Sequence, residues 1–382
     1  MKIPAFYIFI IIFLNSIQIS GQEYKKNNSL FYLHSLADTI SNPSYTPYIN
    51  FWIKFLYTEN DSVRKTFWNP DEVVNLKNDY VLFYDHLFQY SVKPLLNYFK
   101  PYILSVYFED RLCHITTAFW NFSFTPSDTS ALLNSNPFAI LEVGIMHKGN
   151  KMYLTNLLDK RTINWQTFTH KKIKYVVEPS LKINYFEVEQ ACIYVDSLAK
   201  LFSINYDTIS YIVCRTPQSL GYILGFNFFY SGFTFGRAFL DARMIISGRG
   251  TFTYPHELTH MILNPYIKPG KFYSEGLATF FGGSLDKNYK QLFSEFKNNF
   301  SKISDSEFNK IIKYPNSPTA YTLSALIVEI IYNQYGIEGL KKLSESPNNP
   351  NEFLFYLYDK LKISKKAILK KMNLILNQVN QP

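Results

Sequence analysis

The sequence predicts an α+β protein of two domains, the second of which ends in a helical lobe. Three observations lead to this fold class. A helical portion is followed by runs of alternating apolar residues, and from Lys172 the pattern changes to strands interspersed with helices. No internal repeat or low-complexity linker interrupts the 382 residues, and 47% of them are hydrophobic, enough for each half to bury its own core. We place the domains at residues 22–165 and 166–382.

Residues 1–21 have the features of a signal peptide. Lys2 precedes an apolar run from Pro4 to Leu14, and the small residues Ser20 and Gly21 come before the polar segment that follows. This run is shorter than the roughly 18 residues that a membrane span needs. The sequence therefore favours a cleaved signal peptide over the alternative, an uncleaved anchor. We expect an exported protein, periplasmic or secreted, that keeps no stable membrane span once the signal is removed.

The pattern within residues 22–165 predicts helices first and a curved sheet after them. The aromatic run 51–56 belongs to the helical portion. The runs 103–108 and 140–145 read as strands of the sheet. No motif assigns a role to this domain, and five histidines of the chain have no ligand spacing between them: His34, His86, His114, His147 and His170.

In the second domain we expect a strand at 173–177, a helix at 186–202 and a strand at 210–214. A glycine-rich loop follows at 221–236, and a short β-prone run at 243–247 comes after it. The aromatic residues of the loop suit either the wall of a cleft or a cap on the core. The sequence does not choose between these two roles.

The segment after this run contains the pattern His-Glu-x-x-His, formed by His256, Glu257 and His260. On a helix the two histidines project about 40° apart on adjacent turns, so their rings can reach one metal ion. Glu257 lies beside them, where its carboxylate can bond a water on the metal instead of the metal itself. The sequence therefore suggests a zinc site whose general base is Glu257.

An exposed helix can show the same five residues by chance, as part of a solvated face. The flanking residues argue against this alternative. Phe252 and Tyr254 precede the motif, and Met261, Ile262 and Leu263 continue it, so the motif belongs to a largely buried element. A buried cluster of histidines and a carboxylate needs partners, and a metal ion is one such partner.

A third ligand is expected from a second helix. The Asn-Pro pair at 264–265 and the Pro-Gly pair at 269–270 are expected to end the first helix and turn the chain. The second helix is expected to begin near Tyr273, with Ser274 as its N-cap. Fourteen residues separate the second histidine from Glu275, enough for a tight helix-loop-helix that directs Glu275 to the metal.

Residues 256–260 and 274–280 together resemble the active-site helices of the gluzincins, and in their short spacing the bacterial peptidase MA-like proteins. In that family of zinc peptidases a glutamate in an Asn/Ser-Glu-Gly-x-Ala context is the third ligand, and this chain has Ser-Glu-Gly-Leu-Ala. The metzincin pattern is excluded, because Leu263 and Tyr266 stand where it has glycine and histidine. The resemblance implies a zincin-like fold for the second domain and one zinc ion per chain.

This resemblance also implies the site residues and their roles. His256, His260 and Glu275 would bind the zinc, and Glu257 would act as general base. Tyr321, near the start of a later helix, matches the tyrosine that donates its hydroxyl to the oxyanion; in a chain with 30 tyrosines, an ordinary core tyrosine is the alternative. The run 243–247 matches the strand that edges the cleft and binds an extended peptide by strand addition.

The formal charge of +9 comes from scattered lysines, and no nucleic-acid motif accompanies it, so no nucleic-acid partner is expected. The basic run 364–371 reads as the solvated face of a closing helix, with a membrane or polyanion patch as the alternative. With only three cysteines a disulfide-dense scaffold is excluded. Cys192 on an expected helix and Cys214 at the end of an expected strand leave one bridge between neighbouring elements possible, and three buried thiols including Cys113 are the alternative.

Three functions fit these features. The first is an exported zinc metallopeptidase that acts on a peptide or protein substrate. The second is a binding or assembly protein that keeps the gluzincin fold without turnover. The third is a zinc amidase that acts on cell-wall cross-links, because zinc chemistry does not distinguish amides by origin.

Overall fold

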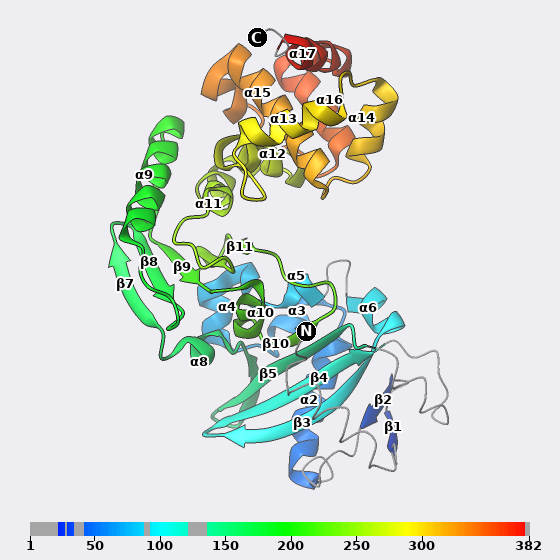
Figure 1. The fold of residues 1–382 in the computed structure, drawn as a ribbon. Helices are drawn as coiled ribbons and strands as arrows, with labels where there is room; N and C mark the ends of the chain where they lie inside the picture. Colours follow the sequence, from blue (N-terminus) through cyan, green and yellow to red (C-terminus); the bar gives the residue numbers. More distant parts are fainter. Residues whose placement is uncertain (1–21, 27–28, 34–41, 88–91, 121–135, 379–382) are drawn as a thin grey trace, which may run out of the picture. The chain divides into compact units, whose positions relative to one another are not determined.

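The computed structural model describes residues 22–26, 29–33, 42–87, 92–120 and 136–378, and the predicted signal peptide lies outside them. The fold is mixed α+β, as the sequence predicts (Figure 1). The chain divides into two compact units: residues 1–163 with 221–233, and residues 164–220 with 234–382. The first unit thus includes a segment from within the predicted second domain, and the second unit contains all the candidate site residues.

The first unit is built on a sheet with the strand order β1-β2-β3-β4-β5-β10, in which β6 also pairs with β5. Adjacent strands are antiparallel except β2 and β3. The strands are β1 (Gln22–Lys26), β2 (Ser29–Leu33), β3 (Lys100–Glu109), β4 (Leu112–Trp120), β5 (Ala139–Lys148), β6 (Lys151–Thr155) and β10 (Phe226–Phe229). The helices are η1 (Pro43–Tyr45), α2 (Thr46–Leu56), α3 (Asp61–Lys65), α4 (Pro70–Leu76), η2 (Lys77–Asp79), α5 (Tyr84–Leu87), α6 (Val92–Tyr98) and α8 (Leu158–Thr162).

The aromatic residues of α2 attach this helix to the sheet. Trp52 is fully buried and stacks on Phe55, with ring centroids 5.5 Å apart. Its indole N–H donates to Thr117 Oγ1 of β4 over 2.9 Å, which satisfies the buried polar atom. The predicted helix around residues 51–56 and the predicted strands within β3 and β5 are confirmed, whereas the sequence did not predict β1 and β2 ahead of the helices.

Residues 221–233 of the glycine-rich loop belong to the first unit. They contain the end of α10 (Pro217–Ile223) and the strand β10, which pairs antiparallel with β5. Gly225 has φ of +107°, and a Cβ there would come within 2.7 Å of the Glu142 carbonyl oxygen, so this close approach requires glycine. Phe229 of the loop packs on Phe138 of the first unit, with ring centroids 5.3 Å apart, whereas Phe235 belongs to the second unit.

The second unit contains a sheet with the strand order β11-β12-β9-β8-β7. The central pairs β12–β9 and β9–β8 are parallel, and the outer pairs are antiparallel. Its strands are β7 (Gln166–His170), β8 (Ile173–Val177), β9 (Ile209–Val213), β11 (Gly236–Phe239) and β12 (Met244–Ser247). Its helices are α9 (Tyr185–Phe202), α11 (Pro255–Ile267), α12 (Lys271–Gly282), α13 (Tyr289–Asn299), α14 (Asp305–Ile312), α15 (Pro318–Lys341), α16 (Pro350–Leu361) and α17 (Lys365–Gln378).

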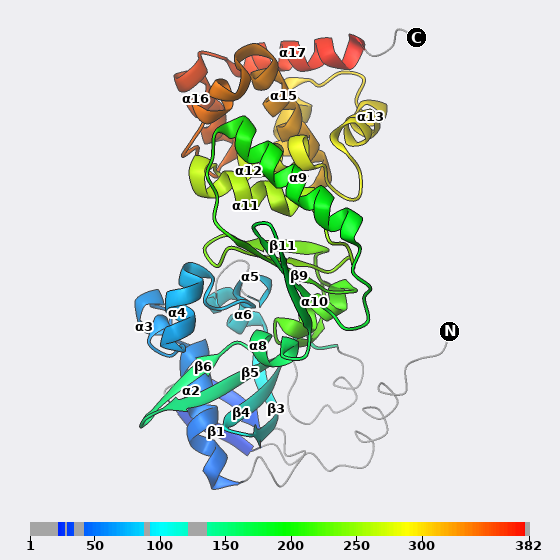
Figure 2. The same ribbon diagram turned by 90° about the vertical axis from the view of Figure 1, so that its left-hand side faces the viewer.

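The helices α9 and α11 lie on one side of this sheet, and the helices from α12 onward follow them to form the predicted C-terminal lobe (Figure 2). One continuous hydrophobic core joins the sheet, these two helices and the lobe. The predicted strand at 173–177 coincides with β8, and the predicted helix at 186–202 and strand at 210–214 differ from α9 and β9 by one residue. These predictions are confirmed.

The expectation that residues 243–247 form an edge strand is wrong. β12 lies between β11 and β9 and is paired on both sides. β11 folds back on it through a tight turn in which Arg243, with φ of +50°, donates its N–H to the Leu240 carbonyl. Because β11 lacks an alternating apolar pattern, its sequence did not reveal it as a strand. Within the described residues β11 pairs with β12 alone and forms the edge.

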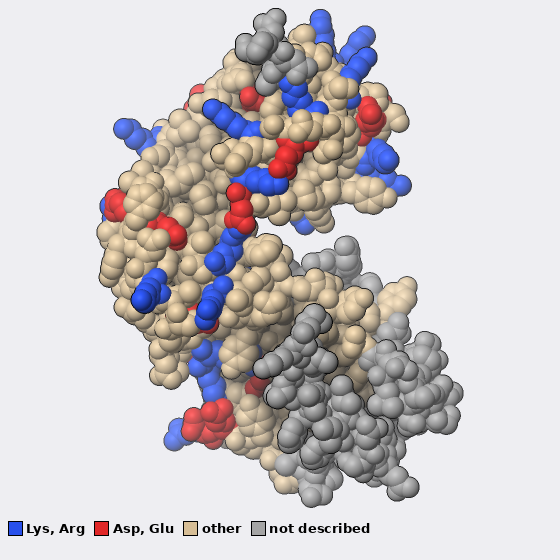
Figure 3. Space-filling model, in the orientation of Figure 1, with Lys and Arg blue, Asp and Glu red and all other residues tan. Residues whose placement is uncertain are grey.

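Charged side chains are dispersed over the face drawn in Figure 3, and several basic ones have an acidic neighbour. In the C-terminal basic run, Lys365 pairs with Asp305 at 2.6 Å. Among the helices that the structure describes, none combines the length and the apolar character of a membrane span. All three cysteines are buried and free, so the alternative of buried thiols is the one observed.

Candidate metal centre

The helix α11 presents the His-Glu-x-x-His residues on one buried face. It begins with Pro255, whose missing N–H is not needed in the first turn, and it has the acidic Glu257 near its positive end. The predicted end at 264–265 is wrong, because α11 continues through Pro265 to Ile267. A proline removes one backbone hydrogen bond, and here the helix lasts for less than one further turn before Lys268 adopts a left-handed conformation.

The helix α12 positions Glu275. It begins at Lys271 instead of Tyr273, and its N-cap residue is Gly270, so the predicted N-cap role of Ser274 is wrong. Asn348, which lies far along the sequence, accepts the N–H of Lys271 over 2.9 Å. A cap supplied from so distant a loop cannot be recognised in a local pattern. Ser274 does not cap the helix, and its hydroxyl contacts His260 instead.

Gly276 allows α12 to pack closely on α15. A Cβ at this position would lie 2.3 Å from Ser324 Oγ and 2.9 Å from the Ser324 carbonyl carbon. Ser324 in turn donates its hydroxyl to the carbonyl oxygen of Phe272 over 2.7 Å. The glycine that follows the metal-ligand candidate Glu275 is therefore explained by helix packing.

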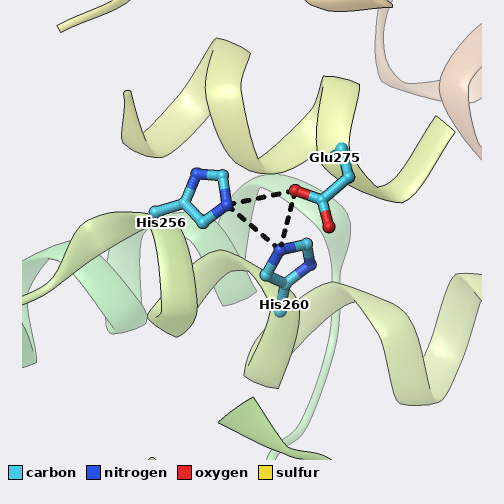
Figure 4. Close-up of side chains that lie close together, drawn as sticks. All are labelled: His256, His260 and Glu275. Atoms are coloured by element: carbon cyan, nitrogen blue, oxygen red, sulfur yellow. Dashed lines mark hydrogen bonds and ion pairs between the residues drawn. The ribbon is translucent and has the colours of Figure 1, made fainter. Parts of the chain in front are cut away.

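His256, His260 and Glu275 converge as a group that could hold a metal ion (Figure 4). The Nε2 atoms of the two histidines lie 3.3 Å apart. Glu275 Oε2 lies 3.3 Å from His256 Nε2 and 3.7 Å from His260 Nε2. Both histidines are buried, with 6% and 8% of their surface exposed, so their converging polar atoms need one another or an ion.

The electrostatic coupling within this group is strong. Burial acts to raise the pKa of Glu275, but the nearby charges and hydrogen bonds of His260 and His256 outweigh burial and hold the pKa far below its ordinary value. Burial acts to lower the pKa of His260, but the charge and hydrogen bond of Glu275 outweigh it and raise this pKa. Glu275 is thus a carboxylate at neutral pH.

A backbone carbonyl orients the ring of His256. The carbonyl oxygen of Gly283 accepts from His256 Nδ1 over 2.7 Å, which directs Nε2 toward the group. This contact depends on close approach, because a Cβ on Gly282 would lie 2.6 Å from the backbone nitrogen of His256. Nothing in the local sequence indicates a carbonyl as partner, since every residue has one.

Two polar side chains orient the ring of His260. Ser274 Oγ lies 3.0 Å from His260 Nδ1 and donates to Asn264 Oδ1 over 3.2 Å. The Asn264 amide nitrogen is 3.4 Å from the same ring nitrogen. The sequence analysis missed both residues. The sequence could have indicated Asn264, because it stands four residues after His260 and therefore on the same helix face.

Glu257 and Tyr321 lie next to the group without belonging to it. The carboxylate of Glu257 makes no hydrogen bond to any residue that the structure describes, although the residue is only 9% exposed. The ring of Tyr321, on α15, is centred 6.5 Å from the ring of His256. Burial, together with the charges of Glu275 and Glu257, raises the pKa of Tyr321 well above its ordinary value. The structure thus brings all five predicted site residues together.

The edge strand β11 borders the same region. A Cβ on Gly236 would lie 2.3 Å from Cε1 of Tyr254 and 3.3 Å from Cγ of Glu257. The edge strand therefore begins next to the Glu257 side chain. The sequence analysis assigned this place to residues 243–247, which β11 separates from the edge.

The other histidines have separate partners. His114 Nδ1 contacts Glu142 at 2.7 Å within the first unit, where His147 bonds the Tyr48 hydroxyl. His170 pairs with Glu189 at 2.7 Å. Within the described residues, no group that could hold a metal ion includes any of these three, and the side chains of His34 and His86 lie outside that part of the chain.

Comparison with protein-family models and with curated proteins finds no match. No protein-family model matches the chain. A search of curated proteins likewise finds no matching sequence. The resemblance to the gluzincins therefore rests on the two sequence motifs.

Proposed function

We propose that the protein is an exported, zinc-dependent metallopeptidase of the gluzincin type. The separations among the three donor atoms support this proposal most directly. Donors bonded to zinc at about 2.0–2.1 Å in a tetrahedron lie about 3.3–3.4 Å from one another. The separations here are 3.3, 3.3 and 3.7 Å, and two imidazoles with one carboxylate form a ligand set that zinc hydrolases use.

The residues around the donors fit this metal as well. Catalytic zinc ligands are held by a second layer of hydrogen bonds, and both imidazoles have such a partner on Nδ1: Gly283 for His256 and Ser274 for His260. A bound zinc would act as a Lewis acid that makes water nucleophilic near neutral pH and polarises the scissile carbonyl.

The chain's own residues supply the remaining chemistry. The Glu257 carboxylate makes no hydrogen bond to a described residue and lies beside the three-residue group. It accepts the proton of the attacking water and then passes it to the leaving amine. The Tyr321 hydroxyl donates to the oxygen on which negative charge develops. The edge of β11, beside Glu257, offers backbone groups for an extended peptide, and this replaces the role expected of residues 243–247.

A metal assay tests the zinc site. The purified mature protein is expected to hold one zinc ion per chain, and His256→Ala is expected to lose it, because two remaining ligands cannot complete the coordination. His170→Ala is the matched control, since His170 lies in the same unit and pairs with Glu189 instead. Well-folded wild-type protein without zinc affinity would rule out the proposal.

A second pair of variants tests the enzyme against a silent scaffold. Glu257→Gln is expected to keep zinc while hydrolysis of a peptide library, followed by mass spectrometry, falls by several orders of magnitude. Glu275→Gln is expected to weaken zinc binding itself. If wild-type protein binds zinc but cleaves no peptide, the scaffold or the cell-wall amidase becomes the better explanation, and an assay on cross-linked cell-wall peptides separates these two.

The export proposal rests on residues 1–21 alone, which lie outside the described structure. Expression of the full chain in a bacterial host is expected to give a protein that is outside the cytoplasm and begins near Gln22. Cell fractionation and N-terminal sequencing check this expectation. A full-length chain in the cytoplasm would contradict it.

A further inference from the structure

Tyr254 lies between the edge strand and the metal-ligand candidates, and the proposed mechanism does not use it. It precedes α11 as the N-cap residue, and its ring is centred 6.3 Å from the ring of His256. Gly236 of β11 packs directly against this ring, since a Cβ there would meet it at 2.3 Å. An extended chain paired with β11 near Gly236 would therefore pass close to both Tyr254 and Glu257.

Arg249 holds the ring of Tyr254 from another side. Its guanidinium carbon is 5.1 Å from the ring centroid of Tyr254 and 5.1 Å from that of Phe235. The same guanidinium forms an ion pair with Asp286, and the Arg249 side chain is only 11% exposed. Because a guanidinium has donors and no acceptor, it cannot take the phenolic proton of Tyr254, which stays available for another acceptor.

Asp286 belongs to a tight turn that also contacts His256. In this turn Ser284 and Lys287 exchange two backbone hydrogen bonds of 2.9 Å, and Asp286 is left-handed with φ of +64°. Gly283, at the start of the turn, is the residue whose carbonyl accepts from His256. The turn at residues 283–287 thus orients His256 through the Gly283 carbonyl. It also holds the Tyr254 ring, because Asp286 pairs with Arg249, which lies over that ring.

We propose that Arg249 and Asp286 form a positioning pair that holds Tyr254 at the metal site, where the Tyr254 hydroxyl donates a hydrogen bond to a carbonyl of the bound peptide. This inference rests on the proposed peptidase function. Tyr254 contacts the substrate, whereas Arg249 and Asp286 act through its ring. The pair thereby contributes to peptide binding without binding the metal.

Two variants and two probes separate this role from a structural one. Tyr254→Phe removes the hydroxyl and keeps the ring that Arg249 covers. Asp286→Asn removes the charge, and asparagine tolerates the left-handed backbone as aspartate does. Glu295→Gln is the matched control, because it breaks the neighbouring Lys287–Glu295 pair of 2.6 Å and leaves Arg249 untouched. The probes for zinc-loaded protein are acetohydroxamate, which reaches only the metal, and a peptide hydroxamate, which also places peptide carbonyls beside the metal.

By calorimetry, Tyr254→Phe and Asp286→Asn are each expected to weaken the peptide hydroxamate about tenfold, while acetohydroxamate affinity and zinc content stay unchanged. The double variant is expected to bind no more weakly than Tyr254→Phe alone, because both changes act through one hydroxyl.

Several results would overturn the proposal. These are unchanged peptide hydroxamate affinity in Tyr254→Phe, additive losses in the double variant, an equal loss in Glu295→Gln, or loss of zinc from Asp286→Asn. Wild-type protein that binds zinc and the peptide hydroxamate but cleaves no peptide would contradict only the peptidase function. Wild-type protein that binds zinc but not the peptide hydroxamate would contradict both.

Discussion

At the scale of single residues, the imidazole of His260 depends on one neighbour four positions away and another fourteen positions away. Asn264 follows it on the same helix, and Ser274 reaches it from α12. Both contacts converge on Nδ1 and leave Nε2 directed at Glu275. The hydroxyl of Ser274 is thus part of the support for a metal ligand, although the sequence suggested only a helix cap.

Removal of the Ser274 hydroxyl is expected to weaken metal binding. Ser274→Ala leaves His260 Nδ1 without its 3.0 Å contact, so zinc affinity is expected to fall about 10- to 100-fold in a competition assay with a chelator. Thr279→Val, on the same helix, is the control, because Thr279 Oγ1 is buried without a partner in the described structure. Equal affinities of Ser274→Ala and wild type would refute this role.

A variant of Tyr321 tests whether its hydroxyl stabilises the oxyanion. Tyr321→Phe is expected to lower kcat by roughly 10²–10³ while zinc content, substrate affinity and thermal stability stay nearly the same, because its hydroxyl makes no hydrogen bond to the residues described. Tyr289→Phe is the matched control: its hydroxyl bonds Glu329 at 2.7 Å, so this variant is expected to lose about 1–3 kcal/mol of stability at an unchanged rate. Wild-type turnover in Tyr321→Phe would remove this residue from the mechanism.

At the scale of elements, the position of Glu275 depends on how closely α12 packs on α15. Gly276 meets Ser324 with no room for a side chain, and Ser324 bonds the Phe272 carbonyl on the same helix. The separation of these helices sets where the carboxylate stands relative to the two imidazoles. The Ser-Glu-Gly sequence is therefore a packing feature as well as a ligand motif.

A methyl group at this contact is expected to disturb both stability and the site. Gly276→Ala places a Cβ 2.3 Å from Ser324 Oγ, so it is expected to cost about 1–3 kcal/mol in urea unfolding and to lower zinc affinity. The double variant with Ser324→Gly, which makes room, is expected to recover part of the affinity. An unchanged unfolding midpoint and an unchanged affinity in Gly276→Ala would show that α12 tolerates the larger residue.

At the scale of the whole molecule, protons and zinc compete for one group. Without metal, the raised pKa of His260 and the lowered pKa of Glu275 stabilise the folded chain between those two values. The His260 contribution is complete below its unfolded pKa and is lost as pH rises through the raised folded pKa. The Glu275 contribution is present above its unfolded pKa and is lost as pH falls through the lowered one.

Zinc requires the neutral imidazole, so its binding has the opposite dependence on pH. As pH falls through the raised pKa of His260, zinc must displace a proton and its affinity declines. We expect the rise in melting temperature at a fixed free zinc concentration to be larger at pH 8 than at pH 6. At 100 times the dissociation constant, zinc adds about 2.7 kcal/mol. A melting-temperature rise that does not vary with pH would contradict this coupling.

The sequence by itself determined the local features of this protein. Helical periodicity placed His256, Glu257 and His260 on one face, because such patterns repeat within a turn or two of chain. Glu275 was expected from its spacing and from the resemblance of its Ser-Glu-Gly context to the gluzincins. The same reasoning located β8, α9 and β9 to within one residue.

Only the tertiary structure decided which strand forms the edge, where α12 begins and what supports each imidazole. The order β11-β12-β9 depends on pairing between segments, the start of α12 on a side chain from residue 348, and the orientation of His256 on the Gly283 carbonyl. Apart from the β11–β12 hairpin, these contacts join residues far apart in the sequence. A backbone carbonyl or an unpaired strand edge has no residue type of its own, so no local pattern can reveal it.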